Sequence, residues 1–420
     1  MFIATLLAFV DSGLSITLHH DLNILNAGNV NFDYVIVGGD TAGLTIAARP
    51  ADWRFQIQSM AICGEVLNDS RYLFKNVLPY FKKTVSFSPP IRAHFTNATP
   101  LFNAIAFDKE GQPVQVSYPK YAIPFSTWVK HGFDEIGLQE AQDFNSGSLM
   151  GHQFYTMTIY QTHGSRSSSE SAFLSQNRQW TFYLYAMAKR ILFDNQNRAR
   201  ATNSFGQQLE KSSFQRVSFT LRNLLMVSSI GPSHVPRTYG IDLITDLSGV
   251  GQNMWDHVHF DFAHHTSQDL RILVTPTSRG NMTIRSADTA DMPVINPNWL
   301  GTDTDKKTAV AAYKRARKVF HTQAMLPVII RQEYFPGSEH ETDSEIPDII
   351  QNTMMTIYHA SCTCKMSISS DRITVVDRRA RVFGVTGLRV IDASAFPILP
   401  PGHLQSTLCQ FILFQNVDGV

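Results

Sequence analysis

The most regular hydrophobic pattern of the chain lies between Phe32 and Ala48. Phe32 and the residues from Tyr34 to Val37 form a short apolar run rich in β-branched side chains, which is typical of a strand buried on both faces of a parallel sheet. Glycines follow directly, and a second apolar stretch then continues until Pro50 ends it. The pattern predicts a strand, a tight turn and the start of a helix, in that order.

Beyond this unit, the periodicity predicts helices and strands along the whole chain. The clearest element is a helix from Ala309 to Phe320, because its apolar residues share one face while the basic residues lie off it. We also predict strands of a second sheet between Leu270 and Pro293, and a short strand from Leu388 to Ile391. The other predicted elements are a weak strand over residues 55–62, a helix end followed by extended chain over 78–90, a strand with turns over 114–124, a helix over 125–136 and a core helix or strand over 180–193.

Composition narrows the range of functions. A chain of 420 residues with 43% hydrophobic residues exceeds what one core organises, so we expect two domains. The formal charge of +1 comes without basic blocks, which argues against a nucleic-acid partner. The apolar runs fall short of the ~20 residues that cross a bilayer, so we expect no membrane span. The four cysteines are too few and too scattered for a disulfide framework or a zinc site.

The amino terminus allows two interpretations. Phe2 to Val10 is an apolar run that resembles the core of a signal peptide within residues 1–20. However, no basic residue precedes the run and Asp11 interrupts it, so the pattern slightly favours an intracellular protein over a secreted one. Three triplets would be glycosylation sites if the chain were exported, and they begin at Asn68, Asn97 and Asn281.

The glycine-rich turn carries the first candidate chemistry. Gly38, Gly39 and Gly43 match a G-x-G-x-x-G loop at every position but one. In a strand–turn–helix unit these glycines let the backbone approach a pyrophosphate at the amino terminus of the helix. Asp40 occupies the second glycine position, where its charge repels a phosphate. Glu65 is at a plausible distance to bind a ribose, although a surface carboxylate is the favoured interpretation.

A second candidate is the run Asp256-His257-Val258-His259. Its residue types suggest a metal site, but no third ligand stands at helical or hairpin spacing. We therefore favour a hydrogen-bonding cluster in a loop and predict that no metal binds.

Two histidines stand out near the carboxyl terminus by their surroundings. His359 lies in YHASCTCKM, and His403 follows a proline-rich turn. The predicted strand from Leu388 to Ile391 runs into Asp392-Ala393-Ser394, so the turn would present His403 at the carboxyl end of a sheet. Ligands bind at that edge in open α/β folds. Histidines in such places are candidates for a binding or catalytic site, although most histidines in a chain that contains fifteen are structural.

These segments resemble the motifs of the glucose-methanol-choline (GMC) oxidoreductases, a family of flavoenzymes, and are most similar to its fungal members. The matching stretches are FDYVIVGGDTAGL, LLMVSSIGP, DLSGVGQNMWDH, YHASCTCKM and VVDRRARVFGVTGLRVIDASAFPILPPGHLQST. They occur in family order from Phe32 to Thr407, and the last block is highly specific.

The resemblance implies an α/β fold with a FAD-binding, Rossmann-like domain and a second α+β substrate domain built on an antiparallel sheet. The FAD-binding domain would be discontinuous. Its parts would be residues 31–80, 165–262 and 352–420, and the substrate-binding domain would comprise residues 81–164 and 263–351.

The resemblance also implies a function. It predicts FAD-dependent oxidation of the CH–OH group of a small-molecule alcohol, with hydride transfer to flavin N5, a histidine base and a role in fungal secondary metabolism. His403 and His359 match the two catalytic residues of the family, and a neutral imidazole with a pKa of ~6.5 suits proton removal near neutral pH. The residues that match cofactor-binding positions are Gly38, Gly39, Thr41, Ala42, Gly43, Asp392, Ala393, Gln405, Ser406 and Thr407.

The chain departs from the family pattern around the cofactor. Family members are longer, and the second strand with its ribose-binding Glu and a Gly-Gly-Ser-Ser-type segment are not found between Arg49 and Pro90. Besides Asp40, Ser229 and Cys362 stand where the family usually has glycine. The tail after Thr407 replaces an expected amphipathic terminal helix.

These departures leave two alternatives to an alcohol oxidase or dehydrogenase. One is a family member with non-redox chemistry, such as a dehydrative cyclase in which the histidines act as acid and base. The other is a non-catalytic, decayed paralogue that no longer holds FAD.

Overall fold

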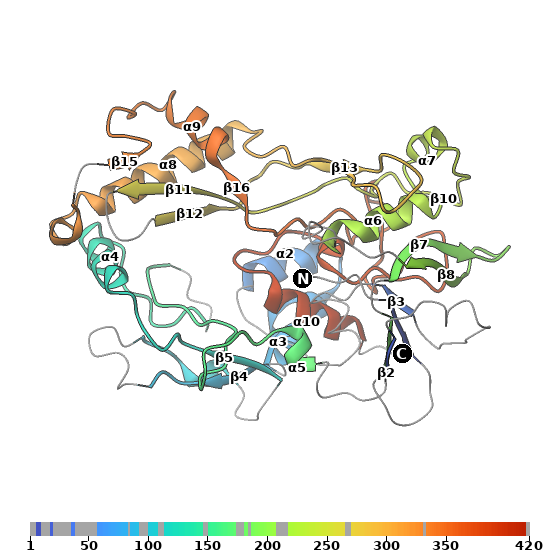
Figure 1. Ribbon diagram of the computed structural model, residues 1–420, viewed down its shortest axis with the longest axis horizontal. Helices are drawn as coiled ribbons and strands as arrows, with labels where there is room; N and C mark the ends of the chain where they lie inside the picture. The colour runs from blue at the N-terminus through green and yellow to red at the C-terminus, as the bar shows by residue number, and fades with distance from the viewer. Residues whose placement is uncertain are drawn as a thin grey trace.

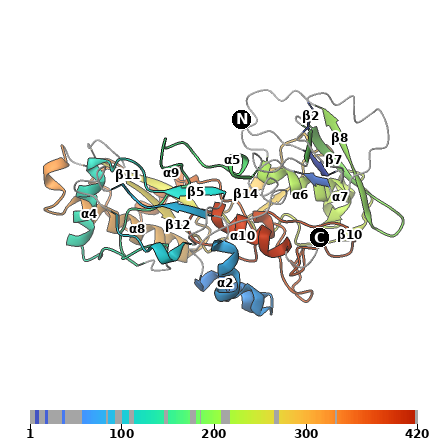
Figure 2. The same cartoon turned by 90° about the horizontal axis from the view of Figure 1, so that it is seen from below.

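The computed structural model describes most of the chain beyond residue 56, together with three short strands before it. The described residues are 6–9, 17–19, 35–37, 57–82, 85–91, 100–107, 113–145, 150–173, 180–183, 186–206, 217–264, 270–330 and 333–416. The turn from Gly38 to Gly43 and the helix predicted after it lie outside these residues. The described elements form an elongated molecule, with α8 and the β11–β12 sheet at one end, β7, β8 and α6 at the other, and α2 and α10 between them (Figures 1 and 2).

The predicted amino-terminal strand belongs to a small mixed sheet. β3 (Val35–Val37) pairs with β1 (Leu6–Phe9), β1 pairs with β6 (Trp180–Tyr183), and β6 pairs with β2 (Thr17–His19). The β1–β3 pair is antiparallel, with Leu7 opposite Ile36. The expectation of a parallel neighbour for this strand was therefore wrong, because a continuous apolar run indicates burial but not the direction of the partner strand.

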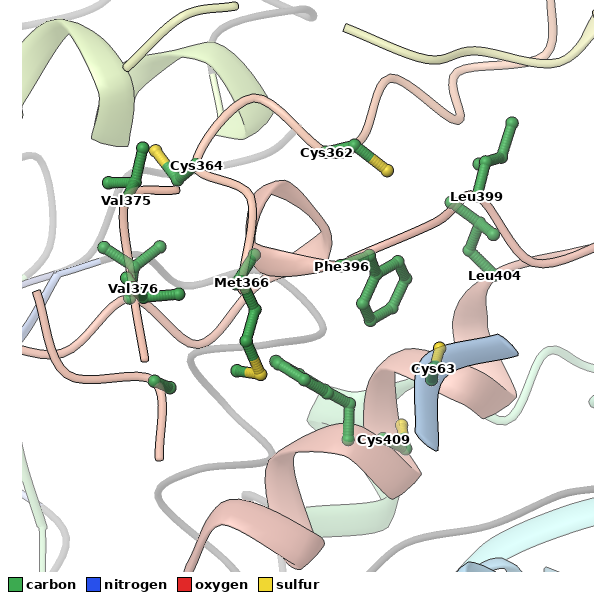
Figure 3. Close-up of a cluster of buried hydrophobic side chains, with 14 of the residues drawn as sticks. Cys63, Cys362, Cys364, Met366, Val375, Val376, Phe396, Leu399, Leu404 and Cys409 are labelled. Carbon is green, nitrogen blue, oxygen red and sulfur yellow. The ribbon is translucent and has the colours of Figure 1, made fainter. Parts of the chain in front are cut away.

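The first hydrophobic core joins helices from both ends of the chain. α2 (Ile57–Val66), α3 (Phe74–Lys82) and α10 (Gln405–Asn416) come together with α6 (Val217–Val227) and the loops after residue 359. Figure 3 shows where Cys63 of α2 and Cys409 of α10 meet Phe396 and Met366 of those loops. All four cysteines are free and buried.

Two sequence-based expectations in this region were wrong. Residues 55–62 were predicted as a weak strand, but α2 includes them from Ile57 onward. Met60, Cys63 and Leu67 lie at helical spacing and are buried together, which outweighs the β propensity of the isoleucines. The tail after Thr407 was predicted to lack a helix, yet α10 continues through it to Asn416.

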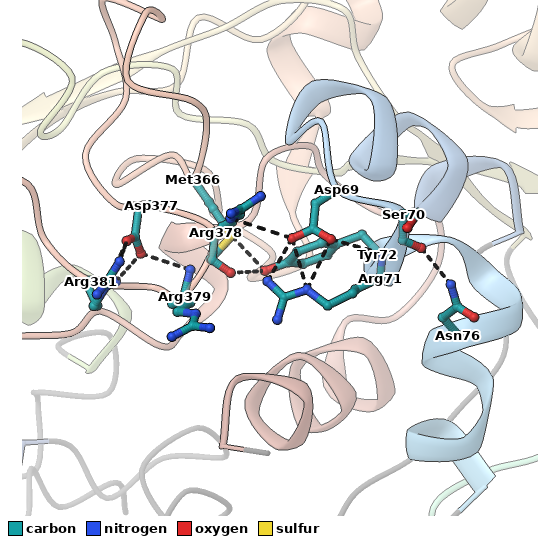
Figure 4. Close-up of polar contacts among 10 residues, drawn as sticks. All are labelled: Asp69, Ser70, Arg71, Tyr72, Asn76, Met366, Asp377, Arg378, Arg379 and Arg381. Atoms are coloured by element: carbon teal, nitrogen blue, oxygen red, sulfur yellow. Dashed lines mark hydrogen bonds and ion pairs between the residues drawn. The ribbon is translucent and has the colours of Figure 1, made fainter. Parts of the chain in front are cut away.

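A polar contact fixes the end of α2 to the carboxyl-terminal loops (Figure 4). Asp69, which caps the short helix η2 (Ser70–Tyr72), accepts hydrogen bonds from the Arg71 side chain and lies 3.9 Å from Arg378 Nε. Burial raises the pKa of Asp69, but the hydrogen bonds from Arg71 and the charge of Arg378 together hold it below its ordinary value. Tyr72 Oη donates to the carbonyl oxygen of Arg378 at 2.7 Å. Segments about 300 positions apart are thereby joined.

β4 (Val85–Ser88) pairs in parallel with β5 (Val114–Ser117), and α4 (Pro124–Glu135) follows β5. The extended chain and the helix agree with the prediction, whereas β5 occupies only the first part of the region predicted over 114–124. Proline at the first position of α4 is favourable, because that residue needs no hydrogen-bond donor. The other short elements near this pair are η4 (Ala104–Ala106) and α5 (Ser169–Phe173).

The second sheet is antiparallel, as predicted, and contains the second core. Of the region predicted to supply its strands, residues 270–274 join this sheet, whereas residues 281–283 pair with residues 294–296 in a separate two-stranded sheet. β11 (Val258–His264) lies at its centre and pairs with β12 (Leu270–Val274), β15 (Glu333–Phe335) and β16 (Met355–Thr356). α8 (Asp303–Phe320) lies along one face of this sheet, with α9 (Ile346–Thr353) beside it (Figure 1). α8 contains the helix predicted over 309–320. Its first turn is capped by Thr302, whose Oγ1 accepts from Asp305 N–H.

The remaining elements are a hairpin and several short segments. β7 (Ala186–Phe193) and β8 (Ala199–Gly206) form a hairpin against α6. The other short elements are β9 (Ile230–Gly231), α7 (His234–Thr238), β10 (Thr245–Asp246), β13 (Asn281–Thr283), β14 (Val294–Asn296), η6 (Leu326–Val328) and η7 (Ala393–Ala395). Over the described residues, no helix combines the length and the apolar character that a bilayer span requires. The domain boundaries given above stay a prediction.

Candidate active site

Three histidines from distant parts of the chain meet in the fold. His257 directly precedes β11, His359 follows β16, and His403 lies just before α10. His257 Nδ1 and His359 Nδ1 are 2.9 Å apart and share a hydrogen bond. The ring of His359 is nearly perpendicular to that of His403, with 5.3 Å between their centroids. We call these three residues the histidine triplet.

The two predicted catalytic residues are therefore neighbours, and a third residue joins them. The sequence singled out His257 only as part of a hydrogen-bonding cluster, because nothing local shows that residues 102 positions apart meet. Its signal was a polar Asp-His pair immediately before a buried strand. Among the described residues, no group of three metal-ligating side chains is close enough to hold an ion.

The backbone before His359 is strained and tightly held. Tyr358 has φ of 66°, a left-handed conformation that costs a bulky residue about 1–2 kcal/mol. Asp256 holds the turn, because its Oδ1 accepts from the N–H of His359 at 3.0 Å and its Oδ2 accepts from Thr356 Oγ1 at 2.6 Å. Such strain persists where surrounding contacts fix the residue, and it is frequent at functional sites.

Burial keeps two members of the triplet, His257 and His359, uncharged. His257 is fully buried, and burial, followed by the neighbouring His403, lowers its pKa to about 4. Burial also lowers the pKa of His359 to about 3, with His257 and His403 acting in the same direction. Burial raises the pKa of Asp256 to about 6. Both inner imidazoles are therefore neutral near pH 7 and available as hydrogen-bonding groups.

His403 differs from the other two because it is exposed, whereas His359 is 8% exposed. The strand predicted from Leu388 to Ile391, before His403, is not formed. The segment forms an isolated bridge between Arg389 and Arg381 in place of a strand ladder, because Gly384 and Gly387 turn the chain at φ of 78° and 74° and leave no long extended run. His403 is thus presented by a loop and the start of a helix, not by the end of a sheet.

The predicted flavin-contacting residues lie beside the triplet. Ala393 O accepts from the N–H of Cys362 at 3.0 Å, which joins η7 to the segment that carries His359. Asp392 caps η7 by accepting from the N–H of Ser394 at 2.8 Å. Gln405 begins α10, and the first turn of a helix directs N–H groups outward, toward an anion or a polar ring.

A buried polar atom supports a ligand at this place. Thr363 follows Cys362 and is fully buried, and its Oγ1 has no hydrogen-bond partner in the part of the chain that the structure describes. Burying a hydroxyl in this way is unfavourable unless a partner is supplied. A heterocycle with carbonyl oxygens and ring nitrogens, such as that of FAD, fits a site with outward N–H groups and an unpaired hydroxyl.

The other predicted cofactor residues are not brought to the site by the described chain. Gly38, Gly39, Thr41, Ala42 and Gly43 lie outside the described residues, as does Asp40. Glu65 lies on α2 and is exposed, as the surface interpretation predicted, although it is in a helix and not in a loop.

The two positions where the resemblance leads us to expect glycine have the backbone that glycine favours. Ser229 has φ of 75° and Cys362 has φ of 66°. Both residues therefore occupy left-handed conformations that a side chain disfavours. The chain has kept the backbone geometry at these positions while losing the residue that adopts it without strain.

Comparison with known proteins gives the chain a family. A sequence model described as GMC oxidoreductase matches residues 276–410. Patulin synthase of Penicillium expansum is 34% identical over 450 residues, covering 82% of this chain and 72% of that protein. Versicolorin B synthase of Aspergillus parasiticus is 31% identical over 439 residues, covering 81% of this chain and 68% of that protein.

Solved structures share the mixed α/β fold. Pyridoxine 4-oxidase from Mesorbium loti superimposes with a TM-score of 0.74 and 19% identity, covering 87% of this chain and 81% of that one. A fungal aryl-alcohol oxidase also gives a TM-score of 0.74, with 16% identity and coverage of 100% and 94%. At these identities the likeness shows the fold alone.

The alignment with patulin synthase is longer than the matched part of this chain. Since 82% of 420 residues is about 344, about 106 of the 450 aligned positions have no counterpart here. The identity and the coverage together nevertheless establish the relationship. The chain belongs to the GMC oxidoreductase family, and it is a FAD-dependent oxidoreductase.

Proposed function

We propose that the protein oxidises the CH–OH group of a small-molecule alcohol to a carbonyl, and that His359 and His403 are the catalytic pair. The observation that carries this proposal is their edge-to-face contact, in which one ring is buried and the other is exposed. The exposed imidazole can meet an incoming alcohol, while the buried one is held in a fixed orientation. Together they can supply a proton acceptor and a hydrogen-bond donor to one oxygen atom.

The hydrogen bonds suggest which nitrogen of His257 and of His359 carries the proton, and therefore which ring donates to the substrate. His257 Nε2 is buried and has no partner among the residues described, and an unpaired acceptor is tolerated more often than an unpaired N–H. We therefore place the proton of His257 on Nδ1, from where it donates to His359 Nδ1. His359 then carries its own proton on Nε2 and can donate it in a hydrogen bond to the substrate oxygen. His257 acts as a positioning residue in this arrangement.

His403 is then the base. With a pKa of about 3, His359 is a weak proton acceptor, and a base works best when its pKa lies near the working pH. His403 takes the hydroxyl proton, and His359 Nε2–H stabilises the negative charge that develops on the oxygen. The substrate loses this proton and a hydride from its carbon, and the C–O bond becomes a carbonyl.

FAD supplies the hydride acceptor when it is bound. We assign its flavin end to Asp392, Ala393 and the first turn of α10, formed by Gln405, Ser406 and Thr407. The unpaired Thr363 hydroxyl and the outward N–H groups of α10 support this assignment. The pyrophosphate is assigned, from the sequence pattern, to Gly38, Gly39, Thr41, Ala42 and Gly43.

The relatives suggest the biological setting. Two of them are named for the synthesis of patulin and of versicolorin B, and both come from fungi. We therefore propose a biosynthetic alcohol as the substrate, in a pathway of fungal secondary metabolism.

One observation also favours a non-redox alternative. Neighbouring neutral imidazoles can catalyse proton transfers without any change in the oxidation state of the substrate, as a dehydrative cyclase requires. Anaerobic mixing of the FAD-loaded protein with an alcohol separates the two functions. Oxidation predicts one carbonyl product for each flavin that is reduced. Conversion of the alcohol while the flavin stays oxidised would overturn the proposal in favour of the alternative.

A further inference from the structure

β11 carries another buried histidine on the same side as the triplet. Side chains alternate between the two faces of a strand, so His257 and His259 point to one face, while Val258 and Phe260 point to the other. Val258 and Phe260 are 0% and 1% exposed and belong to the core beneath α8. His259 therefore lies one strand repeat from His257, on the side of the catalytic pair.

The neighbours of His259 show that this side of the sheet is less closely packed than the other. Residues directly opposite each other in antiparallel strands share a face. His259 is opposite Leu273 of β12 and Met355 of β16, which are 42% and 51% exposed. By contrast, Val274 and Ile272, which are opposite Val258 and Phe260, are both 8% exposed.

His259 is itself 7% exposed, and neither ring nitrogen has a hydrogen-bond partner in the described chain. An imidazole buried without partners destabilises a protein, because two polar atoms lose their bonds to water and gain none. A buried, unpartnered imidazole between partly exposed apolar neighbours, one strand repeat from His257, matches a group that is satisfied by a ligand. The aliphatic side chains of Leu273 and Met355 offer a surface for the carbon skeleton of that ligand.

We propose that His259 is a specificity-determining residue that hydrogen-bonds a second oxygen of the substrate. This inference rests on the proposed function, because it takes the ligand to be the alcohol bound at His403. Two residues along a strand span ~6.8 Å, which separates His259 from His257, the residue hydrogen-bonded to His359, so the second oxygen is remote from the reacting one. The substrate class is thus an alcohol with a flat or apolar skeleton and a remote hydroxyl or carbonyl group.

The test compares rigid alcohols that differ only at the remote position. The wild-type protein and His259→Leu are loaded with FAD, and kcat/KM is measured for 4-hydroxybenzyl, 3-hydroxybenzyl and 4-methylbenzyl alcohol. We expect the wild type to prefer at least one hydroxylated alcohol over the methyl analogue by about tenfold or more. In His259→Leu this preference falls by about tenfold, while activity on the methyl analogue is retained or rises.

Two further variants separate binding from folding. His259→Gln keeps a donor and an acceptor, so it should keep part of the preference. His234→Leu makes the same type of change at an exposed position of α7 and should leave the preference unchanged. His259→Leu should melt at the same temperature as the wild type or higher, because it removes an unsatisfied polar group. A clear fall in melting temperature would show that His259 has a structural partner and would overturn the inference.

The outcomes distinguish this inference from the proposed function. If the wild type reduces its flavin with these alcohols but His259→Leu has the same preference, only the role of His259 is refuted. If the wild type holds FAD but reduces it with none of the alcohols, the proposed function fails for this substrate class, and the inference fails with it.

Discussion

The two faces of β11 differ in packing, in polarity and in how well their polar atoms are hydrogen-bonded. On one face, Val258 and Phe260 pack beneath α8 and are buried among apolar side chains. On the other, His257 and His259 carry buried ring nitrogens without partners in the described chain, beside the exposed Leu273 and Met355. The first face is packed as a stable apolar core is, whereas the second buries polar atoms without hydrogen-bond partners.

This contrast indicates how one strand can stabilise the fold with one face and position candidate catalytic or binding groups with the other. The packed face fixes the position of the backbone, and the open face can then hold polar groups at defined distances at the expense of some stability. Tyr358, with its strained φ, directly precedes His359, and His359 is hydrogen-bonded to His257. Both of these histidines have lowered pKa values. Substitutions on the two faces should therefore have different consequences.

The largest expected effect is on catalysis. His403→Ala should slow flavin reduction by an alcohol by roughly 10²–10⁴, the usual contribution of a general base. Because His403 is exposed, the melting temperature should hardly change. Stopped-flow absorbance under anaerobic conditions measures the rate, and bound FAD is quantified in the same samples. Unchanged reduction kinetics would refute the role of His403 as base.

Substitutions on the packed face should lower the stability of the protein without a direct effect on catalysis. Phe260→Ala should lower the free energy of unfolding by about 3–5 kcal/mol, because it removes a large buried side chain and leaves a cavity. Leu273→Ala is the matched control on the open face, and it should cost less than about 1 kcal/mol because its side chain is 42% exposed. Urea denaturation measures both. Equal losses in the two variants would contradict the contrast between the faces.

The pH dependence of stability should report the buried imidazoles. Folded His257 and His359 have pKa values of about 4 and about 3, whereas an unfolded histidine binds a proton below pH ~6.5. The unfolded state therefore binds more protons below that pH, and stability falls as the pH is lowered from about 6.5 toward 4. Asp256 has a pKa raised to about 6 in the folded state, so its protonation favours folding as the pH falls. This effect of one group is opposed by that of two histidines.

Replacing one imidazole tests this pH dependence. The melting temperature of His257→Asn should fall less steeply than that of the wild type between pH 7 and pH 5, because one of the two groups no longer titrates. Because His257 also helps to lower the pKa of His359, the substitution reduces the contribution of His359 in the same direction. The same slope in both proteins would show that His257 does not resist protonation in the folded state.

The smallest expected effect concerns the backbone strain directly before His359. Tyr358→Gly should raise the free energy of unfolding by up to about 1 kcal/mol, since glycine adopts positive φ without the clash of a side chain. Met355→Gly in β16 is the control, and it should destabilise by about 0.5–1 kcal/mol because glycine weakens an extended segment. If Tyr358→Gly is destabilising to the same extent, the strain inferred from its φ is not present.

Much of the local structure could be predicted from the sequence. The helices over 125–136 and 309–320 correspond to α4 and α8, because their apolar residues recur at helical spacing. The strand over 114–124 corresponds to β5, which ends at Ser117, so its boundary was the weak part. The antiparallel second sheet was expected from the family resemblance and is confirmed.

The assembly of the site could be predicted only in part. His359 and His403 were identified by the motifs around them, and they are in contact. His257 was not assigned a role, because its bond to His359 depends on how β11 and β16 pair, and local periodicity carries no information about that register. The strand predicted over 388–391 failed because Gly384 and Gly387 determine the path of the chain there.

The most direct test of the central claim is anaerobic mixing of the FAD-loaded protein with an alcohol and with the same alcohol deuterated at its carbinol carbon. The account predicts that the visible flavin absorbance is lost, that a carbonyl product forms in equal amount, and that the deuterated alcohol reacts more slowly. Full retention of oxidised flavin with every alcohol tested, in a protein that has bound FAD, would contradict it.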